Sequence, residues 1–216
     1  MEIGCGVGTD LASYAKAGAI VTGCDLTFRS VELARSQFSA YGLKGKFLVG
    51  DAENLPFPSK EFDVVYSFGV LHHTPNIQQA IDEIYRVLKP GGEIIVMLYN
   101  KNSIFFWWDI MFIEGVIHMN LLREQIGDRL SRIEYTGSGA KPLGRVYTKK
   151  QTKKLFYKFT RINIQIFQLK RENIWVPLIG GFVQRLIPDK VIYLISRLWG
   201  WNLFIRAIKG YEDSTL

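Results

Sequence analysis

The sequence predicts an α/β fold in which helices cover both faces of a mostly parallel sheet. Short apolar runs occur at 19–25, 46–51, 62–68 and 93–99, as expected of strands that are buried on both sides. Amphipathic helical patterns separate these runs, and the connections are short. Strands and helices that alternate in this way form doubly wound sheets, because each crossover helix returns the chain to the same sheet.

Two of the intervening helices are marked by apolar residues at helical spacing. The first covers about 31–41 and is followed by Gly42, and the second covers 77–88 and meets the stop signal "KPGG". After residue 100 the pattern changes. Residues 101–147 are rich in aromatic side chains and carry no strand signal, whereas the runs at 162–169 and 201–209 predict two more strands.

Composition indicates a folded domain with a large core. Hydrophobic residues make up 48% of the chain and charged residues 22%, which excludes global disorder. The two cysteines, Cys5 and Cys24, lie in strand-like contexts, so we expect buried free thiols in a reducing compartment. No histidine stands at ligand spacing from them, so no metal site is predicted.

The net charge of +7 is concentrated in the last third of the chain. Residues 140–216 hold 15 basic and 4 acidic side chains. Such a segment could meet an anionic membrane, nucleic acid or an anionic substrate, or it could be a solvated face. Because no nucleic-acid-reading module is recognisable, the sequence argues against nucleic acid. The apolar stretch 103–122 contains Asp109 and Glu114, so a buried or interfacial segment is favoured over a membrane span.

The chain opens with "MEIGCGVGTD", which places a glycine at every second position from Gly4 to Gly8. At the carboxyl edge of a parallel sheet, a glycine-rich turn lets a ligand approach the backbone closely. A dinucleotide-binding fingerprint, G-x-G-x-x-G, would need its third glycine where Thr9 stands. The motif is therefore a G-x-G-x-G variant preceded by a carboxylate, Glu2.

Together with later motifs, this opening resembles the class I S-adenosylmethionine-dependent methyltransferases, and within them the type 11 set that includes ubiquinone- and menaquinone-pathway enzymes. Five stretches carry the resemblance over residues 1–100, in this order: "EIGCGVG", "GCD", "GDAENLPFP", "FDVVYSFGVLHH" and "RVLKPGG". The resemblance implies a Rossmann-like sheet whose last strand is antiparallel, with S-adenosylmethionine as the cofactor. It implies a cofactor-binding core at 1–100, a helical cap at 101–147, and a completion of the sheet at 148–216 with a basic, partly helical insertion at 170–200.

The resemblance also assigns roles to residues. The glycine loop would offer its backbone to the methionine part of the cofactor, Asp25 would accept from the ribose hydroxyls, and Asp51 would accept from the adenine amine. Glu2 would orient the loop or the cofactor's ammonium group. The implied cofactor-binding residues are Glu2, Gly4, Cys5, Gly6, Gly8, Asp25, Asp51, Ala52, Ser67 and Phe68.

Catalytic and acceptor-binding residues are less sharply indicated. His72 and His73 follow the fourth strand, where histidine could accept a proton near neutral pH, or could simply shape the pocket. Side chains that could line an acceptor pocket lie at the end of the fifth strand and just after it: Tyr99, Asn100, Trp107 and Trp108. Each of these could instead belong to the core of the cap.

We therefore expect a cytoplasmic enzyme that transfers a methyl group to a small or lipid-like acceptor by in-line displacement, with peripheral membrane contact through the basic third. In the family, apolar residues and a helix precede the strand that ends at Glu2 and Ile3. We thus expect an N-terminally truncated fragment, with lowered stability and cofactor binding. The alternatives are a non-catalytic fragment and a membrane-surface protein with a vestigial cofactor site.

Overall fold

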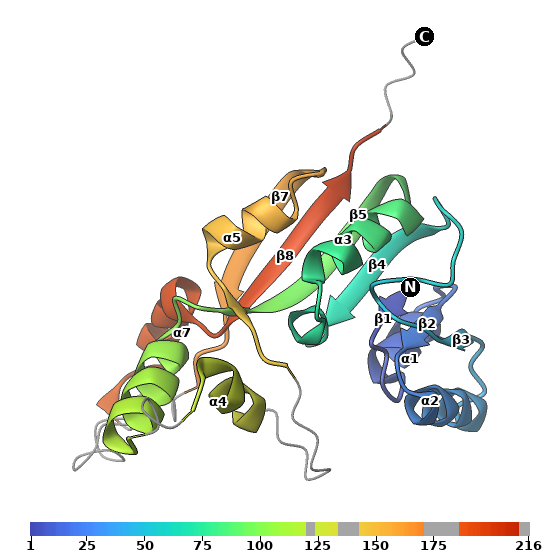
Figure 1. Ribbon diagram of the computed structural model, residues 1–216. Helices are drawn as coiled ribbons and strands as arrows, with labels where there is room; N and C mark the ends of the chain where they lie inside the picture. The colour runs from blue at the N-terminus through green and yellow to red at the C-terminus, as the bar shows by residue number, and fades with distance from the viewer. Residues whose placement is uncertain (120–123, 134–142, 171–185, 212–216) are drawn as a thin grey trace. The chain divides into compact units, whose positions relative to one another are not determined.

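The computed structural model describes residues 1–119, 124–133, 143–170 and 186–211 (Figure 1). The strands are β1 (Glu2–Ile3), β2 (Thr22–Asp25), β3 (Lys46–Val49), β4 (Phe62–Phe68), β5 (Leu88–Asn100), β6 (Val146–Tyr147), β7 (Phe159–Phe167) and β8 (Asn202–Lys209). The helices are α1 (Thr9–Lys16), α2 (Phe28–Ala40), η1 (Leu71–His73), α3 (Ile77–Val87), η2 (Phe105–Ile117), α4 (Ile126–Ile133), α5 (Lys149–Leu155) and α7 (Asp189–Trp199).

The strands form one sheet in the order β3-β2-β1-β4-β5-β8-β7, and β6 pairs with β5 outside this path. The pairs from β3 across to β5 are parallel. Short β1 lies between β2 and β4, with Glu2 opposite both Gly23 and Tyr66. The sheet is therefore mostly parallel, as the sequence predicts.

Strand β8 runs antiparallel to β5. The Asn100 N–H donates to the Trp201 carbonyl at 2.7 Å, and further back along β5 the Glu93 carboxylate pairs with Arg206 at 2.7 Å. Residue numbers thus rise along one strand as they fall along the other. The predicted α/β class, with an antiparallel last strand, is confirmed.

Several elements differ from the sequence-based expectation. Strand β2 begins at Thr22, three residues later than the predicted run. Strand β5 begins at Leu88, so the predicted stop signal "KPGG" lies inside a strand. The register of β5 against β4 shifts between Phe62 and Val64. Strand β6 was not predicted, because its two residues pair with Tyr99 and Asn100 and carry no periodicity of their own.

Contacts divide the chain into two compact units. The first consists of Met1–Met97, Leu155–Asn163 and Ile205–Leu216, and the second of Leu98–Lys154 and Ile164–Phe204. One core cluster of the first unit gathers apolar residues of α1, α2, β3 and the adjoining loops: Cys5, Leu11, Ala12, Val21, Val31, Ala34, Phe38 and Phe47. A cluster of the second unit gathers Phe106, Ile110, Leu130 and Trp201. The three-part division predicted from the sequence stays a prediction.

The aromatic-rich stretch of the second unit forms η2, a π-helix. Its i→i+5 winding is seen where the His118 N–H donates to the Ile113 carbonyl at 3.0 Å. Phe106 is buried, whereas Trp107 is 54% exposed. Within the ranges that the structure describes, no helix is both long and apolar enough to cross a bilayer.

Candidate functional site

The ends of four neighbouring strands bring the predicted cofactor-binding residues to one edge of the first unit. In the order β3-β2-β1-β4, the glycine loop follows β1. Strands β2 and β4 lie directly beside β1, and β3 lies beyond β2. The residues at this edge come from the loop after β1, the end of β2, the loop after β3 and the end of β4: Gly4, Cys5, Gly6 and Gly8; Asp25; Asp51 and Ala52; Ser67 and Phe68. The parallel sheet therefore assembles residues that are far apart in sequence.

The glycine loop uses its glycines in two ways. Gly4, Gly6 and Gly8 all have φ in the left-handed region, between 51° and 81°. A Cβ at Gly4 would lie 2.2 Å from the Val70 side chain, and one at Gly8 would lie 3.3 Å from Ala34. A Cβ at Gly6 would meet nothing within 4 Å. Packing thus explains the first and third glycines, whereas Gly6 leaves open space that a ligand could occupy.

The Asp25 carboxylate fixes this loop to the end of β2. Its Oδ2 accepts from the Gly6 N–H at 2.9 Å, and its Oδ1 accepts from both the backbone N–H and the hydroxyl of Thr27, each at 2.9 Å. A second tie joins the Gly4 N–H to the Cys24 carbonyl at 2.7 Å. Because a carboxylate oxygen can accept two hydrogen bonds, Oδ2 retains capacity for a ligand hydroxyl.

Glu2 places a buried carboxyl group beside the same loop. It is 6% exposed, and its Oε2 has no hydrogen-bond partner among the described residues. Burial, and secondarily the nearby Asp10 carboxylate, raise the pKa of Glu2 to about 8. A cationic group beside a buried carboxyl with an unsatisfied oxygen would stabilise its ionised form. The contact of Glu2 with the cofactor's ammonium group stays a prediction.

The loop after β3 presents Asp51 at the edge in an Asx turn. The Asp51 Oδ1 accepts from the Glu53 N–H at 2.9 Å, and Asp51 itself is exposed. Ala52 is 8% exposed, so its methyl group is buried while the loop continues along the surface.

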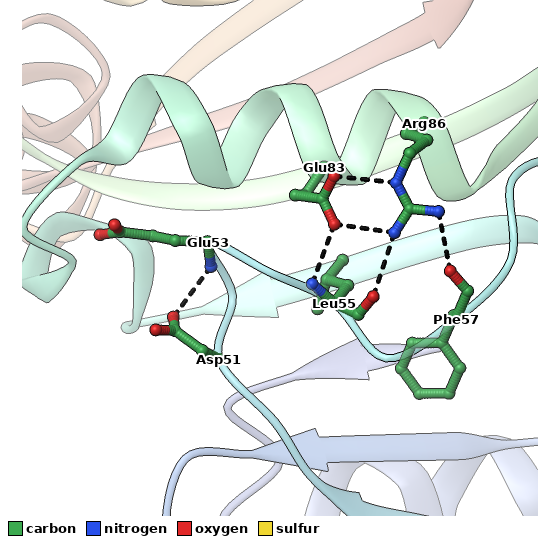
Figure 2. Close-up of polar contacts among 6 residues, drawn as sticks. All are labelled: Asp51, Glu53, Leu55, Phe57, Glu83 and Arg86. Carbon is green, nitrogen blue, oxygen red and sulfur yellow. Dashed lines mark hydrogen bonds and ion pairs between the residues drawn. The ribbon is translucent and has the colours of Figure 1, made fainter.

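Two residues of α3 hold this loop in place, as Figure 2 shows, and we call them the α3 clamp: Glu83 and Arg86. The Glu83 Oε2 accepts from the Leu55 N–H at 2.9 Å. Arg86 donates to the Leu55 carbonyl at 3.0 Å and to the Phe57 carbonyl at 2.7 Å, and it pairs with Glu83 at 2.7 Å. The hydrogen bond from Arg86 lowers the pKa of Glu83. The clamp thus orients the segment that continues from Asp51.

Sequence reasoning missed the clamp. An acidic and a basic residue three positions apart on a helix are the only signal for it, and that spacing usually marks a simple surface pair. Nothing in the local pattern indicates that both side chains reach backbone groups of a loop 28 to 31 residues away.

At the end of β4, Ser67 and Phe68 differ in orientation. The buried Ser67 hydroxyl donates to the Ile3 carbonyl at 3.1 Å, so this side chain joins β4 to β1. Phe68 is 42% exposed and stacks against Tyr66 with ring centroids 6.2 Å apart. Only Phe68 of the two therefore presents its side chain at the surface of the edge.

The two candidate bases lie in η1, directly beyond β4. His72 is fully buried, and burial, with the neighbouring His73 as a second cause, lowers the pKa of His72 to about 3. The two rings lie close, with centroids 4.1 Å apart. Because so weak a base takes up a proton poorly at neutral pH, His73 is the better candidate of the two.

The first two predicted acceptor-pocket residues, Tyr99 and Asn100, belong to the second unit. Tyr99 stacks on Trp201 with centroids 4.4 Å apart. The Asn100 amide donates to the Gly200 carbonyl at 2.9 Å and accepts from the Asn102 N–H at 3.0 Å. The side chain of Asn100 is thus already engaged in holding β5 to the turn before β8.

The two predicted tryptophans lie on η2. Trp107 is 54% exposed and makes an edge contact with Phe106. Trp108 stacks on Phe112 with centroids 4.9 Å apart. Both rings therefore belong to an aromatic surface of the second unit.

The cysteines do not form a metal site. Cys5 and Cys24 are free and buried, and burial raises the pKa of both thiols. Among the described residues, no group of three histidine, cysteine or acidic side chains is placed to bind a metal ion.

Comparison with a family model and with curated relatives gives matches that cover about half of the chain, from 43% to 55% for the relatives. Residues 1–96 match a family model described as a methyltransferase domain. A sterol 4-C-methyltransferase of Caenorhabditis elegans is 36% identical over 98 residues, which are 44% of this chain and 29% of that protein. A demethylmenaquinone methyltransferase of Tropheryma whipplei is 35% identical over 97 residues, which are 44% of this chain and 39% of that protein. The chain spans from 25% to 51% of the length of such curated relatives.

Solved structures are similar over nearly the whole chain. A methyltransferase of Methanosarcina mazei, described as SAM-dependent, superposes with a TM-score of 0.66 at 21% identity, covering 98% of this chain and 92% of that one. A Thermotoga maritima protein, also described as a SAM-dependent methyltransferase, superposes with a TM-score of 0.59 at 20% identity. The match covers 96% of this chain and 80% of that one. At this identity the likeness shows the fold, which is Rossmann-like.

Proposed function

Because this chain, through residues 1–96, belongs to the class I S-adenosylmethionine-dependent methyltransferases, we propose that it methylates a small or lipid-like acceptor by direct displacement. The observation that carries the proposal is the assembly at one sheet edge of the glycine loop, Asp25 and Asp51. When bound, S-adenosylmethionine supplies a methyl group made electrophilic by its sulfonium.

The residues at the edge fit this cofactor. The open space beside Gly6 admits a ligand against the backbone, and the orphaned Oε2 of Glu2 suits the cofactor's ammonium group. The Asp25 Oδ2 has capacity for a ribose hydroxyl, and Asp51 is exposed for the adenine amine. In this proposal these residues bind and orient the cofactor, and the α3 clamp keeps the Asp51 loop in position.

Positioning supplies much of the rate in such a reaction, because it replaces an encounter in solution with an oriented contact. Where the acceptor must lose a proton, His73 would receive it. His72, with its low pKa, would serve the packing behind η1.

The proposed acceptor is apolar in its body. Relatives are named for sterols and for demethylmenaquinone, both ring systems with long apolar parts. The exposed ring of Trp107 and the stacked pair of Trp108 and Phe112 offer this chain an aromatic surface for such a molecule.

The basic third is proposed to contact an anionic membrane surface at the periphery, on the cytoplasmic side. Helix α7 carries exposed apolar side chains at Val191, Leu194 and Leu198, which are 40%, 58% and 60% exposed. Spacings of three and four residues place them on one face, as in helices that lie in a lipid interface. Four exposed lysines of α5 supply positive charge: Lys149, Lys150, Lys153 and Lys154.

The test of methyl transfer is the release of S-adenosylhomocysteine from S-adenosylmethionine with demethylmenaquinone or a sterol as acceptor. We expect acceptor-dependent release with one of the two classes and its loss in Asp25→Ala. The matched control is Asp63→Ala, because Asp63 is an exposed carboxylate that pairs with Lys89 at the surface. Cofactor binding without release for either class would favour the non-catalytic alternative.

The membrane proposal is tested by sedimentation with vesicles of phosphatidylcholine and phosphatidylserine. Binding to the mixed vesicles should disappear at high salt and should weaken in Leu194→Ser, because both charge and apolar contact contribute. Equal sedimentation with phosphatidylcholine alone, or none at low salt, would contradict the proposal.

A further inference from the structure

A cavity of about 290 Å³ lies within the second unit, apart from the residues assigned above to the cofactor. Helices η2 and α4 form its walls and contact each other. Its lining combines two apolar side chains with four charged ones: Phe105, Asp109, Ile110, Glu114, Arg129 and Arg132. The lining thus holds two carboxyl groups and two guanidinium groups.

Two atoms of this lining are buried without a hydrogen-bond partner. Arg129 is only 3% exposed, and its Nη1 donates to the Ile110 carbonyl at 3.0 Å. Its Nε, like the Oδ2 of Asp109, has no hydrogen-bond partner in the part of the chain that the structure describes. Leaving a buried donor and acceptor unsatisfied costs about 1–3 kcal/mol for each group, so a ligand that satisfies both would be stabilised there.

The other two charged residues are more exposed and engage neighbours. Arg132 pairs with Glu124 at 2.6 Å and with Glu114 at 3.7 Å, and Glu114 also lies 3.4 Å from His118. The side chains of Arg132 and Glu114 are 49% and 41% exposed. The unmet hydrogen-bonding capacity is therefore concentrated on Asp109 and Arg129.

We propose that this cavity binds a small neutral molecule with a hydroxyl group on a compact apolar body, the hydroxyl donating to Asp109 Oδ2 and accepting from Arg129 Nε. A hydroxyl is suited to this position because it offers one donor and two acceptor sites. Phe105 and Ile110 provide the apolar walls for the body of the molecule. The volume is at the small end of the range for ligand pockets, which limits the body to one or two rings.

Other polar groups fit the cavity less well. A carboxylate could accept from Arg129, but it has no proton to donate to the ionised form of Asp109, and the Glu114 carboxylate in the same lining would repel it. Burial raises the pKa of Asp109 to about 7, so near neutral pH its carboxyl is present in both forms. A hydroxyl can bond to either form, because it both donates and accepts. The proposal does not depend on methyl transfer.

The experiment compares 4-fluorophenol with 4-fluorotoluene, in which a methyl group replaces the hydroxyl, and follows the fluorine NMR line of each compound in the presence of the full chain. We expect saturable broadening of the 4-fluorophenol line, with affinity about fivefold or more above that for 4-fluorotoluene, as one to two hydrogen bonds would give. In each of the variants Asp109→Leu and Arg129→Lys, the ratio of the two affinities should fall to about one. Arg197→Lys, on α7 in the same unit, is the matched control and should keep it.

Equal affinity for the two compounds in the unaltered chain would overturn the proposal. So would a preference that survives both Asp109→Leu and Arg129→Lys, or the absence of saturable broadening by either compound. Because no cofactor is present in this measurement, its failure is distinguishable from a failure of the proposed methyl transfer.

Discussion

At the residue scale, Gly6 is the position where a single added carbon tests ligand approach. We predict that Gly6→Ala reduces the rise in Tm that S-adenosylhomocysteine produces, with about a tenfold or greater loss of affinity. A Cβ at Gly6 meets nothing in the protein itself, so the loss would come from the space that the ligand needs. The measurement is thermal unfolding with and without S-adenosylhomocysteine.

Gly42→Ala is the matched control for this substitution. Gly42 also has positive φ, at 61°, and a Cβ there would likewise meet nothing within 4 Å. Both variants should lose about 1–2 kcal/mol of stability from the left-handed backbone. Equal ligand-induced shifts in the two variants would show that the ligand does not lie against the glycine loop.

A second residue-scale prediction concerns His72. Its pKa is lowered to about 3, below the value near 6.5 expected in the unfolded chain. Between these values the unfolded state binds a proton that the folded state does not, so stability is lost as the pH falls. This histidine should account for a loss of about 2 kcal/mol between about pH 7 and about pH 5.

Urea unfolding of the wild type and of His72→Phe at both pH values measures this contribution. The variant should lose about 2 kcal/mol less than the wild type on acidification, whatever its stability at neutral pH. An equal loss in the two proteins would mean that His72 titrates normally in the folded state.

At the scale of elements, the α3 clamp joins a helix to a loop. We predict that Arg86→Ala lowers the free energy of unfolding by about 2 kcal/mol, because it removes charge-assisted hydrogen bonds to two backbone carbonyls of a partly exposed site. The Leu55 amide, which donates to Glu83, should also exchange its hydrogen faster. Urea unfolding and hydrogen exchange provide the two measurements.

Arg29→Ala is the matched control for the clamp. Arg29 forms a pair with Glu32 three positions along α2, but its side chain is 76% exposed. Removing it should change stability by no more than about 0.5 kcal/mol. If the two variants were equally stable, with unchanged exchange at Leu55, the clamp would have no role in holding the loop.

Elements differ in how far the sequence predicts them. Strand Phe62–Phe68 matches its predicted limits, and helix Ile77–Val87 lies within one residue of them, because apolar periodicity extends to both ends. Strand β6 and the early start of β5 depend on pairing with distant residues, which no local pattern records. The i→i+5 winding of η2 is equally invisible in an apolar run that suits any buried helix.

At the scale of the whole molecule, strand order explains why much of the candidate site could be predicted. Once the sheet is parallel, segments that end successive strands must meet at one edge, so the glycine loop, Asp25 and Asp51 come together. The second unit offers no comparable rule. The Asn100 amide, for example, bonds to the Gly200 carbonyl 100 residues away, and the sequence gives no sign of that contact.

The central claim is that this edge of the first unit binds the cofactor, and titration calorimetry with S-adenosylhomocysteine tests it most directly. We predict one-site binding to the wild type and to Asp63→Ala, and binding weaker by about tenfold or more in Asp25→Ala. The reason is that Asp25 holds the Gly6 amide and, in this assignment, would also accept from a ribose hydroxyl of the ligand. A folded wild-type chain that produces no binding heat, or an Asp25→Ala variant that binds as tightly as the wild type, would contradict this assignment.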